Sequence, residues 1–596
     1  MLKCFKLLSL ITLLYILIVL GSSSVNAQTT CSTPYPMKSY YISPTGSDSN
    51  TGIDQSHPIA TFNHAWQFLC PGDTLWLMDG TYYQVIEPTI NGISGSPITI
   101  KALNDGKAII DGEYIRSTVV IGKNWNDIAN YNRDTINPYG NHLTVEGIVA
   151  KNSLDAVFVV LARNVILRRC SGYNANTHNN DHVITVWSLG TPAHPANVLV
   201  EDCVAAGSGR KMILAYDTYV NVVFRRNFAA WQTWLGDNFC GGYWPQSDGI
   251  EIYPKAYEDQ PDVLNNSLNE NNIQFGLIPD YGTSLSPNPG LRTGNYYYGD
   301  MSLGAGMRWD NTQRKFVIAT MDNATCTYNG ISKPAACANS NCIDLKGNTS
   351  YRAGFVIATF GNPLMRNNIF KDLFAYGNAG LGIIAGPWGS SSSNNQLTNS
   401  TFIENGQAPA CGSTDNCFNW SGSDTISSSL SPFSFVSNLK IGQGTNPAPG
   451  TGAQLQYRYI DGVLTDEPLW PWPMEERIKS EFADPDLFQA NGVQGQVWTN
   501  FSVTNTVYPI LSQYGAVSTT LPSPFASSLP SPSMTPFPSP NPADVNGSGG
   551  VDFNDLKLIL SNWLGLGSCA TFVCDLNSDA KINAIDASLV IANWGN

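Results

Sequence analysis

The sequence predicts a right-handed parallel β-helix, a solenoid in which each coil of the chain stacks on the coil before it. Three observations favour this fold: a short β-rich template recurs, helical hydrophobic periodicity is almost absent from residues 28–520, and charged residues are scarce. Asp, Glu, Lys and Arg make up 13% of the 596 residues, which is about half the usual share. This composition, with 53 Gly and 11% aromatic residues, argues against disorder and coiled coils and suits an extracellular β protein with many turns.

The first 27 residues have the pattern of a secretory signal. Lys3 and Lys6 precede an apolar run from Leu7 to Leu20, and small residues follow as far as Ala27. We therefore expect a secreted, extracellular protein. An N-terminal membrane anchor is the less favoured alternative, because the apolar run is short. No second long apolar run follows, so the mature chain should have no membrane span.

Net charge and cysteine content limit the possible binding partners and indicate the redox compartment of the protein. The formal charge of -14 becomes -16 without the two lysines of the signal, and no basic patch is visible, so nucleic acid is not an expected partner. The 13 Cys minus Cys4 leave twelve, an even number that permits disulfides in an oxidising compartment without fixing their pairing.

The recurring template defines the body of the protein, residues 28–520. Residues 164–170 read Asn-Val-Ile-Leu-Arg-Arg-Cys, and similar segments begin at Asn197 and Asn221, after a related segment at His142. Spacings of 22, 33 and 24 residues lie in the range of solenoid coils. Weaker copies lie at 367–373 and 395–401. A second β-rich run precedes each copy, at 156–161, 183–187, 212–216, 355–358 and 381–384.

Cys170 and Cys203 occupy the same template position in neighbouring coils. Stacked residues are poorly placed for a disulfide, so an inward-facing ladder of free thiols is favoured over a bridge.

We expect the β-helix body to be monomeric.

The opening of the body carries a further pattern. Residues 40–52 read Tyr-Tyr-Ile-Ser-Pro-Thr-Gly-Ser-Asp-Ser-Asn-Thr-Gly, and turn-bounded segments follow at 58–61, 71–75, 80–82 and 97–100. This resembles the cap and first coil of the pectate-lyase-like superfamily. The resemblance implies the architecture but not the reaction, because lyases, hydrolases, epimerases and non-catalytic proteins share this opening.

A Pro/Ser-rich linker, residues 521–542, separates the body from a tail, residues 543–596. In the tail, Asp544-x-Asn546-x-Ser548 leads to Asp555, and Asp575-x-Asn577-x-Asp579 leads to Asp586, 31 residues later. Oxygen ligands at loop positions 1, 3, 5 and 12 are typical of calcium loops that precede a helix. The tail resembles the dockerin module of secreted polysaccharide-degrading bacterial systems, which implies a small all-α domain, two Ca²⁺ and a cohesin-like scaffold partner. The ligands implied by the resemblance are Asp544, Asn546, Ser548, Gly550, Asp555, Asp575, Asn577, Asp579, Lys581 and Asp586, of which Gly550 and Lys581 use backbone carbonyls.

The tail departs from the dockerin pattern at a few positions. Ser548 replaces a carboxylate, Ala580 replaces a Gly, and Phe553-Asn554 and Ala584-Ile585 stand where dockerins carry Ser-Thr pairs. Ser548 weakens the first calcium loop, and the two changed pairs, at partner-recognition positions, argue against a standard cohesin as the partner.

Aromatic residues in loops beside the strands are candidates for sugar binding, because sugar rings stack on aromatic faces. Four candidates lie in one loop, and a second group comprises Tyr296, Tyr297, Tyr298 and Trp309. Covering the apolar flank of the solenoid is the open alternative, and we expect that role for Trp470 and Trp472. The loop candidates are Trp231, Trp234, Tyr243 and Trp244.

Three segments carry candidate catalytic groups. Lys211 follows a Gly-Ser-Gly turn and could be the base of a β-elimination, with Arg210 binding the substrate carboxylate. Asp248 and Glu251 could be the acid and base of a hydrolase, in a segment that loosely resembles polygalacturonase-type hydrolases. Strand alternation puts these two carboxylates on opposite sides unless Asp248 precedes the strand, and the other polygalacturonase motifs do not occur in the expected order.

The third segment, Asn179-Asn180-Asp181-His182, lies one coil before Lys211, and Asp217 ends the Lys211 run. Asp181, His182 and Asp217 could position a substrate hydroxyl or bind an additional Ca²⁺ at the groove, although turn hydrogen bonds are the commoner role of such residues.

Of the possible functions, the sequence favours a lyase that cleaves an acidic polysaccharide by β-elimination. A glycoside hydrolase and a non-catalytic polysaccharide-binding solenoid remain open, and the sequence does not name the polymer.

Overall fold

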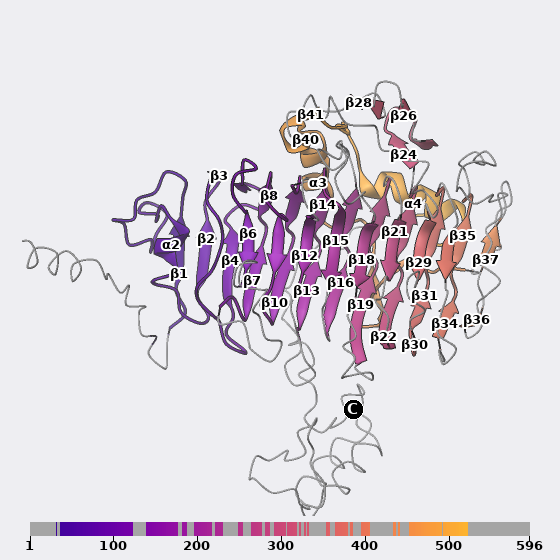
Figure 1. Cartoon of the computed structure of the whole chain (residues 1–596), viewed down its shortest axis with the longest axis horizontal. Coiled ribbons are helices and arrows are strands. Elements are labelled where there is room, and N and C mark those ends of the chain that lie inside the picture. Colours follow the sequence, from indigo (N-terminus) through magenta and orange to yellow (C-terminus); the bar gives the residue numbers. More distant parts are fainter. Residues whose placement is uncertain are drawn as a thin grey trace, which may run out of the picture.

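Long parallel ladders dominate the strand pairing in the computed structural model (Figure 1). The structure describes residues 31, 36–122, 139–176, 181–187, 196–216, 221–230, 248–253, 264–276, 281–285, 291–305, 307–318, 321–322, 327–328, 331–332, 353–357, 364–378, 382–385, 395–405, 433–436, 439–441, 452–490 and 493–521. In some of the strands only the backbone is described. Within these ranges, three long sheets contain most of the strands, and all pairs in them are parallel.

Sheet A contains the recurring template. Its first strands pair in simple register, so that Val165 of one coil lies beside Val198 of the next. The strands of sheet A, in spatial order, are β1 (Ser39–Ile42), β2 (Thr74–Leu77), β4 (Ile98–Ala102), β7 (Leu143–Glu146), β10 (Val165–Arg168), β13 (Val198–Glu201), β16 (Val222–Arg225), β19 (Leu264–Glu270), β22 (Leu291–Tyr298), β31 (Ile369–Lys371), β34 (Asn395–Thr398) and β36 (Phe433–Val436), and β30 (Leu364–Arg366) also pairs with β22.

Sheet B contains the strand that follows most of the sheet A strands. A left-handed residue, such as Arg169 at φ 53° or Asp202 at φ 54°, turns the chain between the two sheets. The strands of sheet B are β3 (Gly80–Tyr82), β5 (Ala108–Asp111), β8 (Val149–Lys151), β11 (Ser171–Tyr173), β14 (Val204–Ala206), β17 (Phe228–Ala230), β20 (Ile273–Phe275), β23 (Met301–Leu303), β32 (Phe374–Tyr376), β35 (Thr401–Ile403) and β37 (Leu439–Ile441).

Sheet C takes the third strand of each coil and contains the second β-rich run of the sequence. Its strands are β6 (Val119–Ile121), β9 (Phe158–Val160), β12 (His182–Val186), β15 (Lys211–Tyr216), β18 (Asp248–Tyr253), β21 (Tyr281–Leu285), β29 (Ala353–Ile357) and β33 (Ile383–Ala385). From β4 to β23 the chain therefore visits sheets A, B and C in turn and advances by one strand per coil. The predicted parallel β-helix is confirmed.

The template Asn forms the bend that leads into sheet A. Asn164, Asn197 and Asn221 all have φ between 49° and 63°, in the left-handed region that Asn tolerates better than most residues. Asn197 Nδ2 donates to Asn164 Oδ1 at 2.9 Å, and Asn221 Nδ2 donates to Asn197 Oδ1 at 2.8 Å. The recurrence seen in the sequence is thus a ladder of stacked bends.

Six charged residues line one register row of sheet A. Alternating cations and anions occupy successive strands, and they pair at 2.8 Å (Lys101 Nζ to Glu146 Oε1), 2.9 Å (Arg168 Nε to Glu201 Oε2) and 2.7 Å (Arg225 Nε to Glu270 Oε2). Stacked opposite charges stabilise the coil register locally. The row comprises Lys101, Glu146, Arg168, Glu201, Arg225 and Glu270.

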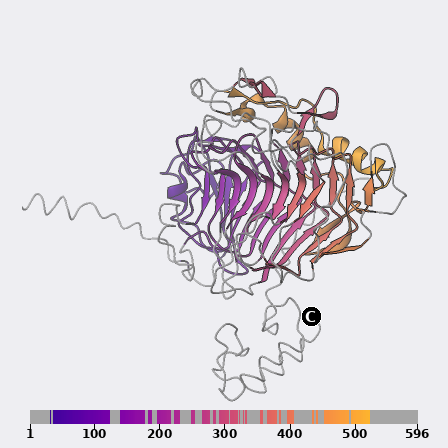
Figure 2. The same ribbon diagram turned by 45° about the vertical axis from the view of Figure 1, so that its right-hand side comes forward.

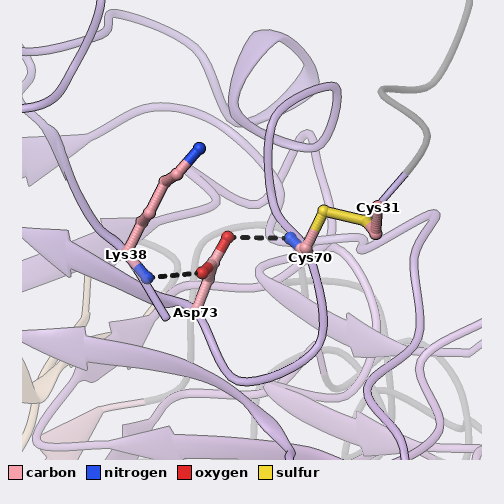
Figure 3. Close-up of a disulfide and its surroundings, with 4 residues drawn as sticks. All are labelled: Cys31, Lys38, Cys70 and Asp73. Carbon is pink, nitrogen blue, oxygen red and sulfur yellow. Dashed lines mark hydrogen bonds between the residues drawn. A yellow bond between two sulfur atoms is a disulfide. The ribbon is translucent and has the colours of Figure 1, made fainter. Parts of the chain in front are cut away.

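The first coils carry a cap that a disulfide closes. Thr61 caps the N-terminus of helix α2 (Phe62–Ala65), and Cys31 is bonded to Cys70 after this helix. Figure 3 shows Asp73 beside the bridge, where its carboxylate accepts from the backbone N–H groups of Cys70 and Lys38 at 2.9 and 2.7 Å.

Cys170 and Cys203 are buried, free thiols in stacked coils. The backbone N–H of Cys170 donates to Cys203 Sγ at 3.3 Å. The prediction of an inward thiol ladder is confirmed for this pair.

A C-terminal cover, residues 452–521, packs on the outer face of sheet B (Figures 1 and 2). Its Trp470 and Trp472 are buried there, as the sequence predicts. The cover comprises β38 (Tyr457–Ile460), β39 (Val463–Pro468), α3 (Glu475–Phe482), the 3₁₀ helix η4 (Pro485–Phe488), β40 (Gln489–Ala490), β41 (Val493–Gln494) and α4 (Val503–Gln513).

The second aromatic group is divided between the core and the cover. Tyr297 lies on β22 and stacks on Phe370 in the solenoid interior, with ring centroids 5.1 Å apart. Trp309, in the hairpin of β24 (Met307–Asp310) and β25 (Lys315–Ile318), is buried against Phe275. Neither residue is available to a sugar, whereas Tyr296 and Tyr298 are partly exposed on sheet A.

The remaining short strands are β26 (Met321–Asp322), β27 (Thr327–Tyr328) and β28 (Ile331–Ser332).

Candidate functional site

One register row of sheet C brings the three candidate segments together. His182 begins β12, Lys211 begins β15 and Asp248 begins β18, and each pairs with the next across the parallel ladder. Tyr281 continues the row on β21. Neighbouring strands of a sheet lie about 4.8 Å apart, so the row places a histidine, a lysine and an aspartate on three successive coils.

A glycine turn sets the position of Arg210 and Lys211. Gly207 has φ 84°, and a Cβ there would lie 2.2 Å from Asn174 Oδ1, so a larger residue would be strained and would displace the Asn174 side chain. The same Asn174 Oδ1 accepts from the backbone N–H of Ser208 at 3.3 Å. Gly209, at φ 153°, completes the turn that starts β15 at Lys211.

Asp181 and Arg210 lie one residue before the row. The backbone N–H of Arg210 donates to the carbonyl of Asp181 at 2.8 Å, which fixes the two segments side by side. Burial, and then the negative charge of Asp155, raise the pKa of Asp181 to about 7. Ser117 Oγ donates to Asp155 Oδ2 at 2.8 Å, whereas Asp181 Oδ2 is buried without a hydrogen-bond partner among the described residues.

His182 and Lys211 are each only 5% exposed. Burial, followed by the positive charges of Lys211 and Arg210, holds the pKa of His182 well below its usual range. His182 is therefore a neutral imidazole at neutral pH. Its Nδ1 is buried and has no hydrogen-bond partner among the described residues.

The structure brings Arg210, Lys211, Asp181 and His182 together at the start of adjacent strands. It also brings the backbone of Asp248 into their row, while Glu251 pairs with Leu214, three positions farther along β18. The side chains of Asp248 and Glu251 are outside the described set, so the prediction of two facing carboxylates stays a prediction.

Several other candidates lie outside the described residues. They are Asp217, the aromatic loop residues Trp231, Trp234, Tyr243 and Trp244, and all ten calcium ligands of the tail. In the part of the chain that the structure describes, no three residues among His, Cys, Asp and Glu form a cluster that could hold a metal ion.

Sequence reasoning missed Asp155 and Ser117. Asp155 lies one coil before Asp181, in a segment that the template did not single out, and only the coil spacing between β9 and β12 could have pointed to it.

No helix in the described ranges has the length and apolarity needed to cross a membrane.

Comparison with protein families matches residues 542–593 to the dockerin type I domain. Among curated proteins, the chain is 33% identical over 75 residues to the uncharacterized protein YwoF of Bacillus subtilis (strain 168). This match covers 13% of the chain and 16% of that relative, so the chain spans about a sixth of the length of the curated relative.

Three solved structures illustrate the likeness of fold. Pectate lyase Pel9A has a TM-score of 0.37 at 16% identity, covering 67% of this chain and 82% of its own. A rhamnogalacturonan lyase has a TM-score of 0.35 at 14% identity, covering 65% and 84%. The lacto-N-biosidase of Eubacterium ramulus has a TM-score of 0.32 at 13% identity, covering 62% and 65%.

Likenesses at this level say nothing about the reaction of this chain. The strand pairing itself establishes the fold of the body. The chain is a parallel β-helix protein that carries a dockerin type I domain at its C-terminus.

Proposed function

We propose that this protein is a secreted lyase that cleaves an acidic polysaccharide by β-elimination. The observation that carries the proposal is the register row of sheet C, in which Lys211 lies between His182 and Asp248 and directly follows Arg210. The proposal divides the chain into a signal peptide (1–27), a β-helix body (28–520), a linker (521–542) and a dockerin domain (543–596).

β-Elimination from a uronic acid needs a base that removes the proton on the carbon next to the carboxylate. Lys211 is the proposed base. Its side chain is only 5% exposed, and a lysine amine accepts a proton in its neutral form. Arg210 provides a permanently charged guanidinium whose fork geometry suits a substrate carboxylate.

His182 contributes a neutral hydrogen-bonding group to the register row of sheet C. Because burial and the two cations lower the pKa of His182, its imidazole is neutral and offers a hydrogen-bonding nitrogen to its surroundings. In the proposed lyase it positions the amine of Lys211 or a substrate hydroxyl.

Asp155 and Asp181 fit part of a calcium site. Asp181 Oδ2 is buried without a partner, and the negative charge of Asp155 acts on the same carboxyl group. Calcium prefers six to eight oxygen ligands, so this pair would need further oxygens from water or substrate. A calcium ion bound there would supply positive charge that neutralises the substrate carboxylate.

The dockerin match supports attachment of the protein to a scaffold through a cohesin-like partner. In this proposal the tail binds two Ca²⁺, through the ten ligands that the sequence indicates. A dockerin delivers its attached module to a site of polymer degradation, which supports a polysaccharide substrate for the body.

The test follows two products together. The full chain is incubated with pectin, alginate, xylan and other plant or algal polymers, and both ultraviolet absorbance of unsaturated ends and new reducing ends are recorded. A lyase gives both signals, a hydrolase gives reducing ends alone, and a binding solenoid gives neither. In the lyase case, Lys211→Ala is expected to lower the elimination rate at least 100-fold, and an unchanged rate would reject the assignment of the base.

A further inference from the structure

We propose that Trp187 and Tyr216 form a sugar-stacking subsite on sheet C, separate from the Lys211 row. This inference rests on the proposed function, because it assumes a polysaccharide ligand.

The two rings lie on the outer face of the sheet. Trp187 packs against Val120, Ala156, Val159 and Leu161, a cluster distinct from the apolar core inside the solenoid. Val120, Val159, Thr185 and Leu214 share one register row of the outer face. Trp187 and Tyr216 each lie two positions farther along their strands than Thr185 and Leu214, so strand alternation puts them on the same face.

The rings contact each other across neighbouring coils. Their centroids are 5.2 Å apart and their planes meet at 83°, which is an edge-to-face arrangement. The backbone N–H of Trp187 donates to the carbonyl of Val160 at 2.7 Å, so the strand holds this end of β12 in place. The pair is therefore a fixed aromatic surface on two coils.

Exposure separates this pair from the aromatic residues that only fill space. Trp309, Trp470, Trp472 and Trp498 are 1–3% exposed, in accord with their role under the C-terminal cover. Trp187 and Tyr216 both remain partly exposed. A partly exposed aromatic pair provides the apolar surface on which the carbon face of a sugar ring packs, and a Tyr hydroxyl is a polar group that can bond to sugar hydroxyls.

Trp187 directly follows β12, which begins with His182, and Tyr216 ends β15, which begins with Lys211. Five residues of a strand separate the two rows, which corresponds to roughly 16 Å. The subsite would therefore bind a different part of the polymer from the part that is cleaved. Contacts remote from the reacting bond that bind substrate and transition state equally lower KM without changing kcat.

The experiment measures polymer affinity in the full chain that carries Lys211→Ala, so that the ligand stays intact. Trp187→Ala and Tyr216→Ala are each expected to weaken binding of the polymer about tenfold, which corresponds to roughly 1.4 kcal/mol. Trp187→Phe keeps a ring and should restore most of the affinity, which separates ring stacking from a folding defect. Trp76→Ala is the matched control, because Trp76 is a partly exposed tryptophan on sheet A and should leave the affinity unchanged.

With Lys211 restored, the same variants should raise KM for the long polymer and leave kcat and the cleavage of short fragments unchanged. If Trp187→Ala changed neither the affinity nor KM while Lys211→Ala abolished elimination, the subsite would be wrong and the proposed lyase would stand. If no elimination occurred but Trp187→Ala still weakened polymer binding relative to Trp76→Ala, the result would support the subsite and contradict the proposed lyase activity.

Discussion

Lys211 and His182 occupy the same register position on the neighbouring parallel strands β15 and β12, and both side chains are almost fully buried. The positive charge of Lys211 is one reason why the pKa of His182 lies well below its usual range, after burial. The relationship links the proposed base to a neutral imidazole, and it makes the pH dependence of the reaction informative.

Because the pKa of His182 is lowered, its imidazole stays neutral from neutral pH down to well below pH 6.5. The elimination rate should therefore show no limb near pH 6.5 that belongs to His182. We expect His182→Gln to lower kcat by about tenfold or more through loss of positioning, while the shape of the pH profile between pH 6 and 8 stays the same. Initial rates of unsaturated product across that range provide the measurement, and a wild-type limb near pH 6.5 that vanished in the variant would contradict the assignment.

A second prediction concerns the attachment of the C-terminal cover to sheet B. Glu481 is buried, accepts from Ser171 Oγ and Tyr173 Oη at 2.7 Å each, and pairs with Arg477 Nε at 2.8 Å. Glu481→Ala leaves Arg477 without this buried partner, so the free energy of unfolding should fall by about 3–5 kcal/mol. Urea unfolding followed by Trp fluorescence reports on the cover, because Trp470 and Trp498 lie within it.

Glu476→Gln is the matched control for the cover. The Glu476 side chain is 86% exposed and lies 3.6 Å from Lys479 Nζ on the same helix, so its loss should change stability by less than about 1 kcal/mol. Equal transitions for Glu481→Ala and Glu476→Gln would show that the Glu481 contacts do not hold the cover.

The sequence predicted the solenoid because its bends and strands repeat within one coil and leave a local pattern. Asn164, Asn197 and Asn221 recur since each forms the same left-handed bend, and that regularity needs no knowledge of tertiary contacts. The C-terminal cover was only partly predictable. Trp470 and Trp472 indicated a covering segment, but the contacts of Glu481 with Ser171 and Tyr173 join residues about 300 positions apart and leave no periodic trace.

In the candidate site, too, local patterns could be predicted from the sequence and contacts between coils could not. The sequence singled out Lys211, Asp181 and His182 from local patterns of turn and strand. It could not show that these residues share a row, because coils differ in length and a shift of one residue would separate them. Asp155, whose charge acts on Asp181, was invisible for the same reason.

A third prediction concerns the buried carboxyl group of Asp300. Its Oδ1 accepts from the backbone N–H and the Nδ2 of Asn272 at 2.8 and 3.0 Å, and Asn272 in turn accepts from Asn227. Burial raises the pKa of Asp300 well above its usual range. Because the folded-state pKa lies above that of the unfolded chain, the carboxyl group favours the folded state most below about pH 4, and this contribution is lost as the pH rises.

Asp300→Asn removes the titration and continues the amide ladder of Asn227 and Asn272. We expect the variant to be more stable than the wild type at pH 8 by roughly 1–3 kcal/mol, and the difference to shrink toward pH 4. Urea unfolding at several pH values measures it. A difference that grew as the pH fell would have the wrong sign and would contradict a raised pKa.

The last prediction concerns the tail, where two loops at an offset of 31 residues match a dockerin type I domain. Asp555 and Asp586 stand at the twelfth position of their loops, which in calcium loops of this type carries the strongest acidic ligand. Calorimetric titration of the full chain should therefore give two Ca²⁺ ions for the tail. Asp555→Ala and Asp586→Ala should each remove one ion, and the double variant should remove both. Asp466→Ala, an exposed acidic residue of the cover, controls for loss of charge and should leave the stoichiometry unchanged. Should the double variant still bind two ions, the ligands would lie elsewhere in the chain and the loop assignment would be wrong.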